Sequence, residues 1–159
     1  KDFVNVGSVG RRHCRWRAVL KGCREKCREN KPKKVGKPVR ITKVLDRHVD
    51  RLKQEYGDKY IFTDNADEVL EDKDIDIIVE LLGREHPAKE FIARAFANGK
   101  HVVTANKDVL AKFGAELFPL AHEHNCDFMF EASVCGGIPI IGPLKTSMAA
   151  NQITSIMVS

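Results

Sequence analysis

The sequence lacks any run of eighteen apolar residues, and no cleavable leader pattern precedes its first apolar segment. These absences argue against a membrane-spanning helix, and we expect a cytoplasmic protein with no membrane partner. Cysteine is scarce, and the five residues are odd in number and irregularly spaced, which favours reduced thiols over a disulfide framework. Because His13, Cys14, Cys23 and Cys27 lack paired Cys-x-x-Cys spacing, we expect no zinc site among them.

Acidic residues are few in the first third of the chain. Residues 1–53 carry 18 Lys and Arg against 5 Asp and Glu, whereas residues 54–159 carry 9 against 17. A nucleic-acid surface would account for the basic part, but only Trp16 accompanies the arginines at positions 11–17, and no helix-turn-helix or zinc-finger spacing is present. We therefore expect no nucleic-acid partner.

Strand patterns and helical patterns alternate along the chain, with no internal repeat and no low-complexity tract. The predicted strands cover residues 3–9, 39–45, 60–62, 75–82, the apolar run that ends at Thr104, residues 126–132 and residues 153–158. The predicted helices cover residues 15–30, a segment through 69–70 capped by Asp64 or Asn65, and residues 87–98, 107–124 and 138–149, with a linker over 32–38. This alternation predicts an α/β fold with a doubly wound parallel sheet of Rossmann type in a single domain.

The run from Gly99 to Asp108 is the strongest candidate for a site. Ligands of open α/β sheets bind beyond the carboxyl ends of the strands, and Thr104, Asn106 and Lys107 stand where this strand ends. The alternative is a solvated turn in which Asn106 caps the following helix and Lys107 points into water. The ten residues alone leave both interpretations open.

The first strand-to-helix turn should carry the G-x-G-x-x-G fingerprint that binds a pyrophosphate, and here that fingerprint is damaged. Gly10 suits its first position, but Arg12 and Arg15 occupy the second and third. A side chain at position 12 would block the close approach of backbone to phosphate, so the sequence predicts weak cofactor binding. Alternatively, the arginines bind phosphate by their charge.

Three segments together closely resemble homoserine dehydrogenase. They are DIIVELLG at residues 76–83, GKHVVTANK at 99–107 and FEASVCGGIPII at 130–141, in that order and spacing. The resemblance extends from Val4 to the end of the chain, apart from residues 10–17. It implies an NAD(P)-dependent enzyme that interconverts aspartate semialdehyde and homoserine on the route to threonine and methionine, as a homodimer.

The resemblance also implies site residues. Contacts to the cofactor are expected from Gly10, Arg11, His13, Cys14, Arg47, Leu82 and Lys107, and a monovalent cation, usually sodium, is expected to be surrounded by Glu131, Val134, Gly136 and Ile138. A carboxylate and backbone carbonyls are hard oxygen ligands that suit such an ion. The alternative is that Glu131 caps a strand end and the glycines make a turn.

Cofactor preference depends on the end of the second predicted strand. An acidic residue there binds the ribose 2′-hydroxyl of NAD, while an arginine nearby suits the 2′-phosphate of NADP, and Asp46-Arg47 offers both. The family often has an arginine matching Arg47, which favours NADP.

The expected domains are a dinucleotide-binding domain over residues 1–150 and, over 151–159, the start of a connection to a substrate-binding and dimerising domain. In the family, that second domain supplies the aspartate and lysine that bind substrate and relay the proton. Two alternatives remain at this point: a truncated or frameshifted module without catalysis, and a related amino-acid dehydrogenase such as one acting on aspartate.

A frameshift would explain the damaged fingerprint. Residues 12–17 (RHCRWR) can be encoded CGG-CAC-TGT-CGG-TGG-CGG, and the same bases read one position later encode Gly-Thr-Val-Gly-Gly. The alternative is a divergent loop with a basic cluster.

Overall fold

The computed structural model describes residues 3–10, 37–155 and 157. The helix predicted over residues 15–30 and most of the linker predicted over 32–38 lie outside these ranges. Within them, no helix is long and apolar enough to cross a membrane.

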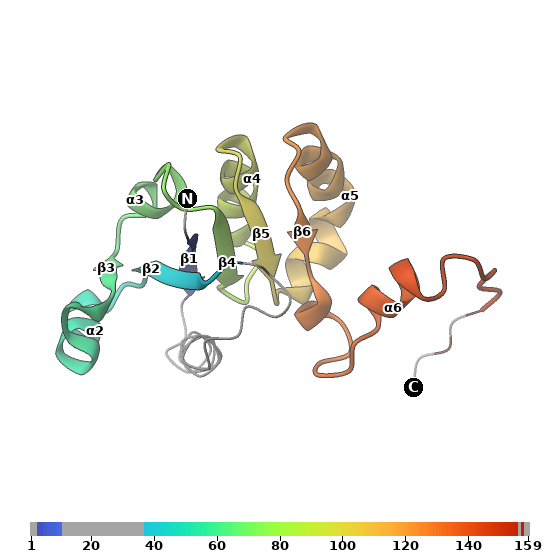
Figure 1. Ribbon diagram of the computed structural model, residues 1–159, viewed down its shortest axis with the longest axis horizontal. Helices are drawn as coiled ribbons and strands as arrows, with labels where there is room; N and C mark the ends of the chain where they lie inside the picture. The colour runs from blue at the N-terminus through green and yellow to red at the C-terminus, as the bar shows by residue number, and fades with distance from the viewer. Residues whose placement is uncertain (1–2, 11–36, 156, 158–159) are drawn as a thin grey trace.

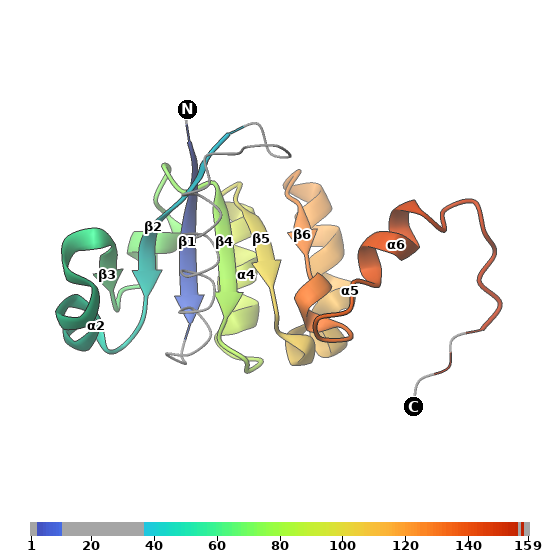
Figure 2. The ribbon, with the colours of Figure 1, turned by 60° about the horizontal axis from the view of Figure 1, so that its bottom comes forward.

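A six-stranded sheet forms the centre of the molecule (Figures 1 and 2). Its strands are β1 (Val4–Gly10), β2 (Val39–Leu45), β3 (Ile61–Thr63), β4 (Ile77–Leu81), β5 (His101–Thr104) and β6 (Phe128–Met129). They lie in the order β3-β2-β1-β4-β5-β6, and every neighbouring pair is parallel. This order is that of dinucleotide-binding doubly wound sheets, in which the strand order reverses between β1 and β4.

A helix follows each strand from β2 to β6. The helices are α2 (Val49–Tyr56), α3 (Asp67–Leu70), α4 (Ala88–Ala97), α5 (Lys107–Glu123) and α6 (Ile141–Thr146), with short 3₁₀ turns η1 (Gly57–Lys59) and η2 (Glu131–Ser133). In Figure 2, α4 and α5 lie behind the sheet, while α6 extends away from it. The alternation confirms the predicted fold class.

Two hydrophobic clusters hold the helices on the sheet. The larger one joins the sheet to α4 and α5 through buried residues that include Val9, Ile78, Phe96, Val102 and Leu117. The smaller one lies around α2 and comprises Val6, Ile41, Val44, Leu52, Phe62 and Leu81. Burying these side chains supplies most of the free energy that stabilises the fold.

Most predicted boundaries in the first two thirds of the chain are confirmed within two residues. The α4 helix ends before Gly99, whose φ of 68° is the left-handed conformation that terminates helices. The Asn106 side chain caps α5, and α5 continues through Pro119 as one helix. The predicted cap of α3 by Asp64 or Asn65 is wrong, because the residue at the N-cap is Ala66. The Asn65 side chain still accepts a hydrogen bond from the N–H of Asp67, the first residue of α3.

Three predictions near the C-terminus are wrong. The strand predicted over residues 126–132 contains only β6, because two residues pair with β5 before the chain turns into η2. The helix predicted over 138–149 is shortened to α6, whose first turn is fixed by the Glu131 carboxylate. Residues 153–155 and 157 form no strand, because they do not pair with any strand of the sheet that the structure describes.

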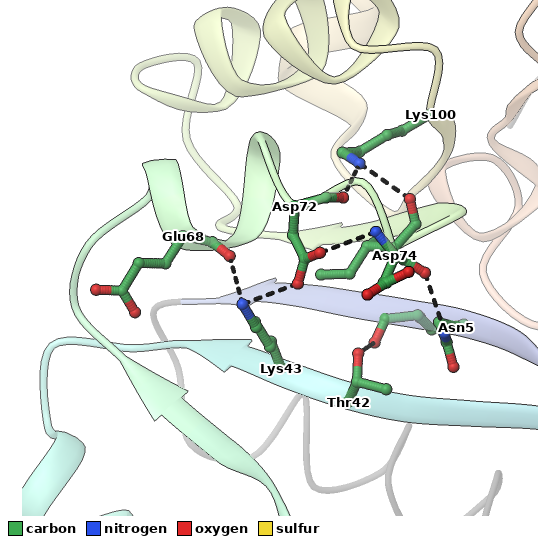
Figure 3. Close-up of polar contacts among 9 residues, drawn as sticks. Asn5, Thr42, Lys43, Glu68, Asp72, Asp74 and Lys100 are labelled. Carbon is green, nitrogen blue, oxygen red and sulfur yellow. Dashed lines mark hydrogen bonds and ion pairs between the residues drawn. The ribbon is translucent and has the colours of Figure 1, made fainter.

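The amino edge of the sheet is closed by a polar network (Figure 3). Lys100 is only 2% exposed, and its ammonium donates to the backbone carbonyls of Asp72 and Ile75. Lys43 donates to the Glu68 carbonyl and pairs with the Asp72 carboxylate at 2.8 Å, which holds the pKa of Asp72 below its usual value. These contacts fix the loop before β4 at the edge opposite to the carboxyl ends of the strands.

Candidate functional site

The candidate site lies at the carboxyl edge of the sheet, where the parallel strands end in loops. Gly10 is the last residue of β1 and pairs with Leu81 of β4. Leu82 follows β4 and is buried, while Lys107 begins α5 and is exposed. Parallel strands bring their carboxyl ends to one edge, so these three residues lie at the same edge of the sheet. Their contacts to a cofactor stay a prediction.

The turn between β5 and α5 is built around Asn106, which is 2% exposed. Its Oδ1 accepts from the Val109 N–H at 3.3 Å, and its Nδ2 donates to the Arg84 carbonyl at 2.8 Å. The cap thus also ties this turn to the loop after β4. Lys107 is held at the start of a 17-residue helix, where its ammonium faces solvent at the edge of the site.

Asp46 and Arg47 follow β2 and differ in orientation. Asp46 is 6% exposed, and its Oδ1 accepts a hydrogen bond from the His48 N–H at 2.9 Å. Its backbone N–H donates to the Thr63 carbonyl, which fixes the turn. The Asp46 carboxylate therefore faces its own turn, whereas the Arg47 side chain is exposed to solvent.

The loop after β6 is organised by Glu131. Its Oε1 accepts from the backbone N–H groups of Ile140 at 2.5 Å and Ile141 at 2.8 Å, and its Oε2 accepts from that of Gly142 at 2.8 Å. The N–H groups of Gly142 and Ile140 hold the pKa of Glu131 below its usual value. The carboxylate therefore fixes the first turn of α6.

The remaining members of the predicted cation set lie in the loop between Glu131 and α6. Val134 is half-buried, whereas Gly136 and Ile138 are exposed. Cys135 and Gly136 have φ values of 53° and 60°, so the chain turns sharply there. Within the described residues, no group of three His, Cys, Asp or Glu side chains is placed to hold a metal ion. Any cation here would have to be bound chiefly by backbone carbonyls.

Three predicted cofactor residues lie outside the described part of the chain: Arg11, His13 and Cys14. No role was predicted from the sequence for Glu80, which contacts two loops of this edge. Glu80 in β4 is fully buried, and its carboxylate accepts from the Leu82 N–H and the Thr104 hydroxyl, each at 2.6 Å. The sequence could have indicated Glu80, because it is the single acidic residue in the apolar run IIVELL at positions 77–82.

The strand order, together with loops that converge at the carboxyl edge, defines a dinucleotide-binding domain of Rossmann type. Residues 6–131 match the family model described as homoserine dehydrogenase, NAD binding domain. The chain is 40% identical to the homoserine dehydrogenase of Bacillus subtilis over 123 residues and 43% identical to that of Neisseria gonorrhoeae over 124 residues. It therefore belongs to the homoserine dehydrogenase family, of which it represents the NAD-binding domain.

Solved structures agree with this assignment. The homoserine dehydrogenase of Thiobacillus denitrificans is similar over 94% of this chain and 34% of its own, with a TM-score of 0.85 and 38% identity. A hyperthermophilic archaeal homoserine dehydrogenase in complex with NADPH is similar over 89% of this chain and 48% of its own, with a TM-score of 0.72 and 27% identity. The alignments cover 77% and 78% of this chain but only 28% of the Bacillus and Neisseria relatives.

Proposed function

We propose that this chain is the NADP-binding part of a homoserine dehydrogenase, which interconverts aspartate semialdehyde and homoserine in threonine and methionine biosynthesis. The observation that carries the proposal is the family membership of residues 6–131. The archaeal relative that was solved with NADPH supports a nicotinamide cofactor. Bound NADPH would supply the hydride, and the residues of this chain would bind and orient it.

The preference for NADP over NAD rests on the turn after β2. The Asp46 carboxylate accepts a hydrogen bond from its own turn, whereas Arg47 is exposed beside it. An arginine at this place suits the 2′-phosphate of NADP, because the guanidinium forms charge-assisted hydrogen bonds to phosphate.

The other proposed contacts come from loops of the same edge. Gly10 ends β1 where the pyrophosphate would approach the backbone, and Arg11, His13 and Cys14 continue the same turn in sequence. Leu82 and Lys107 would border the nicotinamide, with the exposed ammonium available to a polar substrate group.

A monovalent cation, such as sodium, is part of the proposal. Val134, Gly136 and Ile138 would contribute carbonyl oxygens, since none of these carbonyls accepts a backbone hydrogen bond from the described residues. The sharp turn at Cys135 and Gly136 favours convergence of such oxygens. Glu131 would hold the loop in shape through its contacts to the start of α6.

The proposed organisation follows the sequence analysis. Residues 1–150 would form the dinucleotide-binding domain, and residues 151–159 would begin the connection to a substrate-binding domain through which two subunits pair. The enzyme would work in the cytoplasm on small molecules, without nucleic acid or membrane.

Cofactor binding is tested by titrating the chain with NADPH and NADH and following cofactor fluorescence. The unaltered chain should bind NADPH more weakly than micromolar because of the side chain at position 12, and Arg12→Gly with Arg15→Gly should tighten binding. In that double variant, Arg47→Ala should lower NADPH affinity by about tenfold or more and leave NADH affinity unchanged.

Arg94→Ala is the matched control. This half-exposed arginine lies late in α4 and pairs with Asp67 and Glu71 at the two ends of α3, away from the turn after β2. It should leave both affinities unchanged. Micromolar NADPH binding by the unaltered chain would refute the steric argument, and equal losses for NADH and NADPH in Arg47→Ala would refute the NADP preference.

Activity is tested on a longer chain that joins these residues to the second domain of a homoserine dehydrogenase relative, with glycines at positions 12 and 15. Homoserine-dependent reduction of NADP supports the proposal. No activity with homoserine would favour a non-catalytic module, and activity with aspartate instead would favour a related dehydrogenase.

A further inference from the structure

Glu80 is a fully buried acidic residue at the centre of the sheet. It lies in β4, and its backbone is in register with Val9 of β1 and Thr104 of β5. None of the ion pairs formed by the described residues includes it. The hydrogen-bond donors to its carboxyl group are therefore neutral groups.

The donors come from two different loops. The Leu82 N–H donates to Oε1 at 2.6 Å, and the Gly83 backbone faces the same carboxylate; both belong to the loop after β4. The Thr104 hydroxyl donates to Oε2 at 2.6 Å, and the Asn106 side chain also faces it from the turn before α5. One carboxylate thus joins two loops that are more than twenty residues apart in sequence.

Further hydrogen bonds extend this joint. The Asn106 N–H donates to the Thr104 hydroxyl at 3.0 Å, while Nδ2 of Asn106 donates to the Arg84 carbonyl. The Ser133 hydroxyl donates to the Thr104 carbonyl at 2.9 Å, which brings in the loop after β6. The three loops that hold the proposed nicotinamide and cation contacts are therefore connected through Glu80 and Thr104.

Such a residue is costly for stability. Burial raises the pKa of Glu80, and the hydrogen bonds from Thr104, Leu82, Asn106 and Gly83 oppose that shift. An apolar side chain at a buried strand position avoids this desolvation cost altogether, so the carboxylate calls for a role other than stabilising the core.

We propose that Glu80 is a positioning residue, which joins the loop after β4 to the turn before α5 and so holds Leu82 and Lys107 in place for the cofactor. The inference rests on the proposed function. Glu80 does not touch the cofactor in this proposal; it acts through the backbone of Leu82 and through Thr104.

The test is amide hydrogen exchange on the 159-residue chain, with Glu80→Gln and Thr104→Val. In Glu80→Gln, an amide NH₂ replaces one acceptor oxygen, so either the Leu82 N–H or the Thr104 hydroxyl loses its acceptor. Because the Asn106 N–H is bound to that hydroxyl, the connection between the loops weakens on both sides. After correction for any change in global stability, the Leu82 and Asn106 amides should exchange about tenfold faster than in the unaltered chain. Thr104→Val should accelerate Leu82 on the other loop, and Thr104→Ser, which keeps the hydroxyl, should restore the original rate.

Lys100→Met is the matched control, because it removes a buried charge from the amino edge. It should lower global stability without a specific effect on Leu82 or Asn106. The same substitutions are then made in the variant with glycines at positions 12 and 15, where Glu80→Gln should weaken NADPH binding and Lys100→Met should not.

The outcomes separate the two proposals. If Leu82 and Asn106 exchange as before in Glu80→Gln, Glu80 does not join the loops and the inference is wrong. If they exchange faster but no variant binds NADPH, the proposed function is wrong, and with it the assignment of Glu80 to a cofactor site. Faster exchange together with weaker NADPH binding supports both.

Discussion

Replacing Asn106 by Ala should lower the free energy of unfolding by roughly 2 kcal/mol. The substitution removes the cap on the Val109 N–H, which is worth about 1 kcal/mol at a helix N-terminus. It also removes the donor to the Arg84 carbonyl, and a neutral hydrogen bond contributes about 1 kcal/mol. Because Asn106 is 2% exposed, water does not readily replace either partner.

Urea unfolding followed by circular dichroism measures this loss. With a slope of about 1–3 kcal/mol/M, the midpoint should fall by roughly 1 M. Asn106→Ser keeps an oxygen for the Val109 N–H and loses the bridge to Arg84, so it should cost about half as much.

The control is Asn98→Ala, which removes an exposed side-chain hydrogen bond to the Arg94 carbonyl. It should change stability by less than about 0.5 kcal/mol. If Ser and Ala at position 106 cost the same, the cap contributes nothing; if Asn106→Ala matches Asn98→Ala, the reasoning on both hydrogen bonds is refuted.

Two further predictions concern packing and pH. Gly7→Ala should lower the urea midpoint by an amount equivalent to about 1–3 kcal/mol, because the added Cβ would lie 2.8 Å from Val69 Cγ1. Gly137→Ala is the control, since its added Cβ would meet nothing within 4 Å, and it should leave the midpoint unchanged. Equal midpoints for the two variants would contradict this prediction. The pKa of Glu131 is lowered in the folded chain, so its stabilising contribution is present above its ordinary pKa of 4.5 and is lost as the pH falls through the folded value. Exchange of the Gly142 amide, corrected for its intrinsic rate, should therefore accelerate in acid, and Glu131→Gln should remove that pH dependence; an unchanged pH dependence in the variant would assign it to another group.

The sheet was predictable from the sequence because its strands are apolar runs that end in small or polar residues. Val39–Leu45 and the run ending at Thr104 became β2 and β5 as expected. The segment after β6 was not predictable in this way. Its conformation depends on the side chain of Glu131, which accepts hydrogen bonds from residues nine to eleven positions away. The local periodicity of apolar residues does not predict such a contact.

The place of the candidate site in the fold was also predictable only in part. Asn106 and Lys107 follow from the rule that ligands bind beyond the carboxyl ends of parallel strands. The helix α2 was not placed in advance, and neither was a role for Glu80. In the sequence, Glu80 is a single charged residue within an apolar strand. Only the register of β4 with β5 shows that it lies beside Thr104. Contacts across a sheet depend on that register, which a single sequence does not specify.

The segments on either side of the damaged fingerprint form the expected strands of the sheet. The β1 strand continues to Gly10 in parallel register with β4, and β2 begins at Val39 in register with Val4 of β1. Both flanks therefore keep the strand pairing of a dinucleotide-binding sheet, and the departure from the family lies between them. A frameshift confined to residues 11–17 stays our hypothesis for it. Resequencing the coding DNA tests this: codons that cannot encode Gly-Thr-Val-Gly in the neighbouring frame would eliminate the frameshift and leave a genuine basic loop, whose arginines would then have to bind phosphate by charge.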